Sequence, residues 1–126
     1  MIPAQFRRII QAEAGETLVI SKGKEKCLNL YPLKVWNEVI LKELHALEPG
    51  PEKRNLIRFY SEKSHQVNVD KAGRVAIPSN FLFMIGNTRK VVVIGALTYI
   101  EIWAMEDFGE IKKNALKTYI EGNWQY

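Results

Sequence analysis

The sequence has very little cysteine. Cys27 stands alone among 126 residues, so no disulfide can form within one chain. We expect a small buried apolar side chain there, not a reactive thiol. No stretch approaches the run of about 20 apolar residues that a membrane-spanning helix needs. The first ten residues, MIPAQFRRII, have no long apolar core behind a basic start, so no secretory signal is expected. These absences favour a reducing cytoplasm and no membrane partner.

Patterns of catalysis and metal binding are also missing. His45 and His65 are 20 positions apart and have no cysteine or acidic cluster at ligand spacing, so no metal site is predicted. The sequence contains no nucleophile elbow, no phosphate-binding loop and no Ser/His/Asp set at a supporting spacing. The sequence therefore predicts neither an enzyme nor a cofactor.

The composition is that of a soluble globular protein. Apolar residues make up 47% of the chain and charged residues 25%, over a length that suits one ordinary domain or two very small ones. Lysine and arginine number 18 against 14 acidic residues, which gives a net charge of +4. Such an excess is compatible with a nucleic-acid partner, although many proteins without one share it.

Short strands and short helices alternate along the chain. Alternating apolar residues predict strands, and apolar residues three and four positions apart predict helices. Expected strands cover 17–22, 26–31, 65–70, 90–95 and 99–103, with a further short strand after Arg74. Expected helices cover 3–11, 32–47, 52–60, 78–86 and 104–120. The motif EPGP at 48–51 is the strongest break in the chain.

This order of elements occurs twice. The segment IPAQFRRII at 2–10 matches IPSNFLFMI at 77–85, and further along Gly23, Tyr31 and Trp36 match Gly95, Trp103 and Phe108. The repeat predicts two copies of one unit, at 1–49 and 65–126, joined by a helical connector at 50–64. We expect Trp36, Trp103 and Phe108 to be core or subunit-interface anchors.

The first copy is incomplete. Met1 aligns with Ala76, so the counterpart of HQVNVDKAGRVA would precede the first residue. We expect an unpaired sheet edge beside Ile2 and the first hairpin, which soluble proteins rarely keep. A start assigned too far downstream, or a shortened chain, is the favoured explanation. A genuine short form paired through a neighbouring subunit is the alternative. An in-frame D-x-x-G-R codon run upstream would decide between them.

The turn Asp70-Lys71-Ala72-Gly73-Arg74 carries the most specific signal. Gly73 supplies a positive φ at low cost, and Asp70 can accept hydrogen bonds from the backbone just ahead. Asp70 can also hold the guanidinium of Arg74 as a flat, oriented fork. One interpretation is that the two residues only brace the turn. The other is that Arg74 projects outward to donate to guanine O6 and N7, while Lys71 meets a phosphate.

The stretch VDKAGRVAIPSNF resembles the D-x-x-G-R-x-x-I-P motif of the SpoVT–AbrB superfamily. Together with LNLYPLKVWNEV, RNLIRFYSE and VVVIGALTYIEIW, it resembles the MraZ family over nearly the whole chain. The resemblance implies a mainly β, α+β fold of two tandem swapped-hairpin barrel halves with short helices, assembled into rings. It implies a homo-oligomeric transcriptional regulator of the division and cell-wall gene cluster, nucleoid-associated in the cytoplasm. Its implied partner is double-stranded promoter DNA with tandem, G-rich direct repeats.

Carried over by residue, the resemblance makes Asp70, Lys71, Gly73 and Arg74 the DNA-reading loop. Arg7 and Arg8 lie on a solvated face or contact phosphate or a neighbouring subunit, and both alternatives stay open. The same holds for the hairpin-tip residues Lys22, Lys24 and Lys26, between a solvated turn and a phosphate contact. A protein-interaction module of the antitoxin type is the alternative function. The absence of a long disordered tail counts against it.

Overall fold

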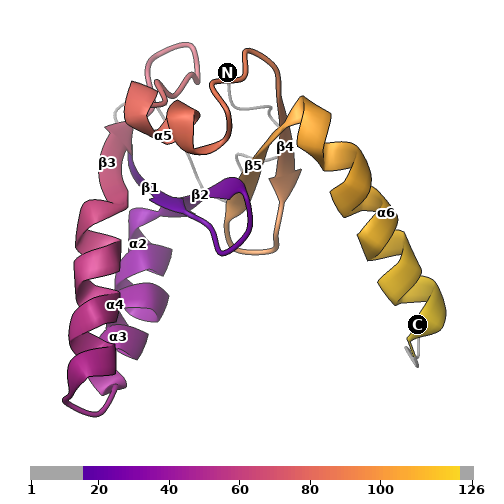
Figure 1. Cartoon of the computed structure of the whole chain (residues 1–126). Coiled ribbons are helices and arrows are strands. Elements are labelled where there is room, and N and C mark those ends of the chain that lie inside the picture. The colour runs from indigo at the N-terminus through magenta and orange to yellow at the C-terminus, as the bar shows by residue number, and fades with distance from the viewer. Residues whose placement is uncertain (1–15, 123–126) are drawn as a thin grey trace.

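A computed structural model describes residues 16–122 as an α+β protein built on one five-stranded antiparallel sheet (Figure 1). This confirms the expected α+β class. The sheet has the order β3-β1-β2-β5-β4. Its strands are β1 (Thr17–Lys22), β2 (Cys27–Pro32), β3 (Ser64–Asn68), β4 (Val91–Gly95) and β5 (Ile100–Ala104). The helices are α2 (Leu33–Val35), η1 (Trp36–Leu41), α3 (Lys42–Ala46), α4 (Pro51–Glu62), α5 (Ser79–Met84) and α6 (Met105–Glu121).

Two predicted elements differ from the structure. The strand expected after Arg74 is reduced to one antiparallel bridge between Val69 and Val75. Its extension is cut short because Pro78, which cannot donate a ladder hydrogen bond, caps α5. The helix expected at 32–47 is interrupted by the π-helical stretch η1, an expansion that apolar spacing does not reveal. The helix expected at 3–11 lies outside the described residues.

A pseudo-twofold axis between β2 and β5 relates the two halves of the sheet. In the first hairpin Leu18 pairs with Pro32, and in the second Val91 pairs with Ala104. These partners are 14 and 13 positions apart, so the registers of the two antiparallel hairpins differ by one residue. The pairs that join β2 to β5 include Leu28↔Ile102, Asn29↔Glu101 and Leu30↔Ile100. Because Leu28 matches Ile100 and Leu30 matches Ile102 in the repeat, the first and third of these pairs are equivalent, and the middle pair lies on the axis. The pairing of β2 with β5 is therefore symmetric about the Asn29–Glu101 pair.

The outer edges of the two hairpins are not equivalent. Strand β3, which follows α4, pairs antiparallel with β1 and covers the edge of the first hairpin. The expectation of an unpaired edge beside that hairpin is therefore wrong, and Ile2 lies outside the described residues. The free edge belongs instead to β4, which has no partner strand on its outer side among residues 16–122. All residues of β4 are half-buried, whereas four of the six in β1 are buried.

The main core lies on the sheet face that α5 covers. The alternation of β1 and β2 places Leu18, Ile20 and Leu28 on this face, where Phe81 and Ile85 of the α5 segment pack against them. Each of these side chains is fully buried, and such burial stabilises the fold by about 1.5–3 kcal/mol per large apolar residue. Helix α5 is thereby fixed on the sheet, and so is the chain segment that leads into it.

Aromatic residues form a second cluster on the opposite face. The ring of Trp36 lies 5.5 Å from that of Tyr31 and 5.9 Å from that of Tyr60, which belongs to α4. Trp103 is also buried and donates its indole N–H to Glu101 at 3.1 Å. These contacts confirm both tryptophans as core anchors, while Phe108 is only half-buried.

Cys27 is buried, as predicted, and no second cysteine lies near it. Burial, and after it the nearby Glu101 carboxylate, raises the pKa of its thiol to about 11. The thiol therefore stays protonated and unreactive at neutral pH.

Candidate nucleic-acid interface

The turn between β3 and α5 is closed by backbone hydrogen bonds. The N–H of Asp70 donates to the Arg74 carbonyl at 2.9 Å, and the N–H of Gly73 donates to the Asp70 carbonyl at 3.0 Å. Gly73 has φ +76°, in the left-handed region where other residues are strained. Glycine is therefore required at this corner.

The Asp70 carboxylate organises the whole turn. Its Oδ1 accepts from the backbone N–H of Arg74 at 2.8 Å and from that of Ala72 at 2.9 Å. Its Oδ2 accepts from Nε of Arg74 at 3.0 Å. These bonds hold the pKa of the Asp70 carboxyl below its usual value, chiefly through the Arg74 backbone N–H and then through its guanidinium. The predicted bracing of Arg74 by Asp70 is confirmed.

The Arg74 side chain points away from the body of the protein. It is 64% exposed, and only its Nε engages Asp70. No hydrogen bond from residues 16–122 engages its two terminal nitrogens. A planar guanidinium that is held from one side and open on the other can donate two parallel hydrogen bonds to an external acceptor. Lys71 is also exposed and has no ion pair within the described part of the chain.

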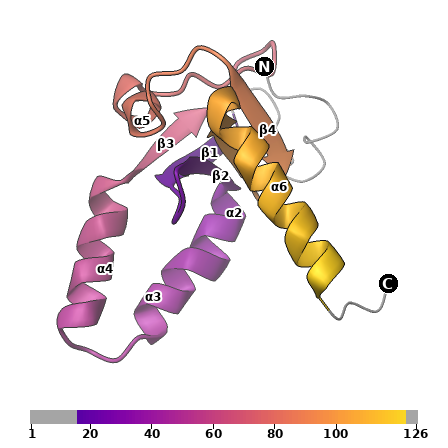
Figure 2. The same cartoon turned by 45° about the vertical axis from the view of Figure 1, so that its right-hand side comes forward.

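The turn lies at the end of the molecule opposite the free ends of the long helices. Figures 1 and 2 show it beside α5, while α3, α4 and α6 extend the other way. The loop between α5 and β4, which carries Arg89 and Lys90, lies at the same end. Sequence reasoning overlooked this basic pair, although a charged dipeptide directly before an apolar strand was the available signal.

The other basic candidates give a mixed result. Arg7 and Arg8 lie outside the described residues. Lys22 donates to the carbonyls of Gly23, at 2.8 Å, and of Glu25, and Lys26 pairs with Asp107 at 3.3 Å. Lys22 and Lys26 therefore stabilise the first hairpin tip and its contact with α6.

The described residues offer no metal cluster and no membrane-spanning helix. Within residues 16–122, no group of three His, Cys, Asp or Glu side chains could hold a metal ion. No helix in that range is long and apolar enough to cross a membrane. The Asp70–Arg74 turn is thus the most organised exposed polar feature described here.

Comparison with known proteins gives matches to one family. The sequence profile described as "MraZ protein, putative antitoxin-like" matches residues 62–120, which include the turn. Two relatives are named "Transcriptional regulator MraZ". The one from Dictyoglomus thermophilum is 38% identical over 114 residues, which is 90% of this chain and 75% of the relative. The one from Clostridium tetani is 35% identical over 112 residues, or 87% of this chain and 75% of the relative.

The names of these relatives place the chain in a class of transcriptional regulators and not of enzymes. The chain belongs to the MraZ family.

Proposed function

We propose that this protein regulates transcription by binding double-stranded DNA in a sequence-specific way, with Arg74 as the base-reading residue. The observation that carries the proposal is the braced guanidinium: Asp70 holds Nε at 3.0 Å, and the terminal nitrogens face solvent. Arginine bonded to O6 and N7 of guanine is the commonest specific contact in the major groove. Each such contact gives about 1–3 kcal/mol of discrimination between bases.

The neighbouring residues have supporting roles in this proposal. Asp70 fixes the guanidinium before DNA arrives, so that less side-chain freedom is lost on binding. Gly73 gives the corner the φ that it needs. Lys71 contacts a phosphate, and Arg89 and Lys90 do the same at the same end of the molecule. Phosphate contacts position the protein on the duplex without reading sequence.

Selective binding needs several such turns on one body, because a single arginine contact is weak. A ring of subunits would present identical turns to tandem, G-rich direct repeats spaced about one helical turn (about 10 bp) apart. Linking the contacts in this way raises affinity by about 10²–10⁴-fold. We also propose that the two repeat halves, at 1–49 and 65–126, form a swapped-hairpin barrel. We further propose that the protein is associated with the nucleoid in the cytoplasm and acts on the division and cell-wall genes. Strand β3, at the start of the second half, pairs with β1 of the first half. This pairing between halves supports the swapped-hairpin arrangement.

The decisive experiment is Arg74→Ala. Binding to DNA from upstream of the protein's own gene is compared with binding to scrambled DNA by fluorescence anisotropy. We expect selectivity to disappear while assembly and thermal stability stay unchanged. Arg54→Ala, on the exposed surface of α4, removes an equal charge far from the turn and should retain selectivity. An Arg74→Ala protein that still distinguishes the two DNAs would exclude Arg74 from base reading.

A protein-interaction module is the second candidate, because the matching family description contains the words "antitoxin-like". The two functions differ in their response to salt. Binding through DNA phosphates releases counterions, so the logarithm of the affinity must fall steeply and linearly with the logarithm of salt concentration. Weak salt dependence would favour the interaction module.

A further inference from the structure

Helix α6 carries an exposed apolar stripe. Leu116, Tyr119 and Ile120 are 58%, 62% and 68% exposed, and no residue of the helix is buried. Their spacing of three and four positions places them on one face, as in helices that dock into a groove. A stripe of this kind on a helix end that extends from the body indicates a contact surface.

The repeat shows what the stripe lacks. In the first half, the helical segment after β2 is covered by α4, where Tyr60 packs edge-on against Trp36. The matching segment after β5 is α6, and Phe108 holds the place of Trp36. No helix within residues 16–122 covers α6 as α4 covers the first segment. The second half thus repeats the apolar face without repeating its cover.

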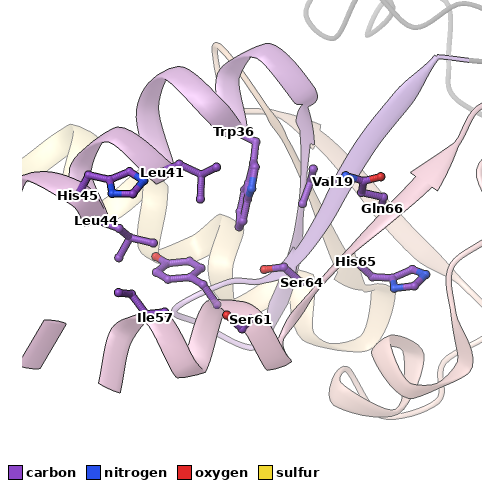
Figure 3. Close-up of a pocket in the computed structure, with 11 residues that line it drawn as sticks. Val19, Trp36, Leu41, Leu44, His45, Ile57, Ser61, Ser64, His65 and Gln66 are labelled. Atoms are coloured by element: carbon purple, nitrogen blue, oxygen red, sulfur yellow. The ribbon is translucent and has the colours of Figure 1, made fainter. Parts of the chain in front are cut away.

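The first half contains a groove that fits such a face. A cavity of about 380 Å³ opens between α3, α4 and the β1–β3 edge (Figure 3). Apolar side chains line it, namely Trp36, Leu41, Leu44, Ile57 and Tyr60. Polar side chains, among them Ser61 and Gln66, also line it. The groove therefore combines mostly apolar lining with a few hydrogen-bonding groups, as peptide and ligand sites commonly do.

Groove and stripe of one chain cannot meet. Figures 1 and 2 show α6 and the α3–α4 pair leaving different sides of the sheet and diverging. Complementary apolar surfaces at two separate places on one molecule make a heterologous contact, which joins copies head to tail. Lys112, which lies within the stripe, can pack its aliphatic stem there and place its ammonium near the polar side chains of the groove.

We propose that the groove between α3 and α4 receives the C-terminal half of α6 from a second copy, with Leu116, Tyr119 and Ile120 as anchors. Repetition of this contact closes a ring if the rotation per subunit divides a full turn. The inference deepens the proposed function, because it names the surface through which several Arg74 turns would be joined. Its evidence is independent of DNA.

Two variants test the contact by complementation. Leu116→Glu spoils the stripe and leaves the groove intact, whereas Ile57→Glu spoils the groove and leaves the stripe intact. Both side chains are more than 40% exposed, so neither change should unfold the protein, and circular dichroism checks this. By native mass spectrometry we expect an oligomer for the native protein and monomers for each variant. The mixture should form a 1:1 dimer through the one contact that remains.

Matched controls put glutamate on the polar faces of the same helices. Lys117→Glu on α6 and Asn55→Glu on α4 should assemble like the native protein. A monomeric native protein, a mixture that stays monomeric, or an Ile57→Glu protein that still assembles would overturn the proposal. If the Ile57→Glu protein still assembles, the contact lies elsewhere, for example between the α6 helices of two copies. None of these results bears on base reading, which is tested separately by the selectivity of Arg74→Ala.

Discussion

The two halves of the sheet are both antiparallel hairpins but differ in what covers them. In the first half, β3 pairs with the outer edge of β1, and α4 packs over Trp36. In the second half, β4 has a free edge and α6 an open face within the described residues. Helix α4 comes from the segment between the repeats, and β3 stands at the start of the second one. Similar repeat sequences therefore fix similar local structure, while long-range packing makes one half closed and the other open.

The comparison predicts unequal costs of removing matched aromatic side chains. Trp36→Ala should lower the free energy of unfolding by about 3–5 kcal/mol, because the ring is buried between Tyr31 and Tyr60. Phe108→Ala should cost about 1–1.5 kcal/mol, since the ring is half-buried. Urea unfolding measures both values. Equal losses would mean that a partner covers Phe108 in solution, and repeating the measurement with Leu116→Glu would reveal whether that partner is a second copy.

The free edge of β4 predicts a difference in backbone protection. Amides of β1 are bonded to β2 or β3, so they should exchange with solvent only on large-scale opening. Amides of β4 that face away from β5 should exchange at least about 10-fold faster. Hydrogen exchange followed by NMR resolves the two strands. Equal protection would show that another segment pairs with β4 in solution.

The titration of the Asp70–Arg74 turn can be followed through its own amides, because two backbone N–H groups donate to the Asp70 carboxylate. The pKa of Asp70 in the folded protein lies below its ordinary value of about 3.9. The stability that the turn gains from the carboxylate is therefore complete above that ordinary value and is lost as the pH falls through the folded pKa. The amide signals of Ala72 and Arg74, which donate to Asp70, should shift together with a midpoint below about 3.9.

Asp70→Asn is the control for this titration and should abolish the shared shift. A midpoint at or above the ordinary value would contradict the hydrogen-bonding pattern of the turn.

Much of this structure could be predicted from local pattern. Period-two apolar residues indicated the strands, and Asp, Gly and Arg at a spacing of four indicated the braced turn. The pairing of β3 with β1 could not be predicted, because Val67 would face an apolar partner equally well on either hairpin. The choice depends on where α4 delivers the chain. The π-helical stretch η1 also escaped prediction, since one additional residue in a turn leaves the apolar spacing almost unchanged.

The pair at the pseudo-twofold axis shows what joining two repeats in one chain permits. Asn29 lies opposite Glu101 there. Two identical halves with glutamate at this place would set two carboxylates against each other, which destabilises a sheet. Because the two halves are encoded separately in one gene, the residues at the axis can differ. Glu101 can therefore accept a hydrogen bond from the Trp103 indole N–H, while Asn29 opposite it stays neutral. Duplication thus frees the centre of the sheet from the need to be compatible with itself.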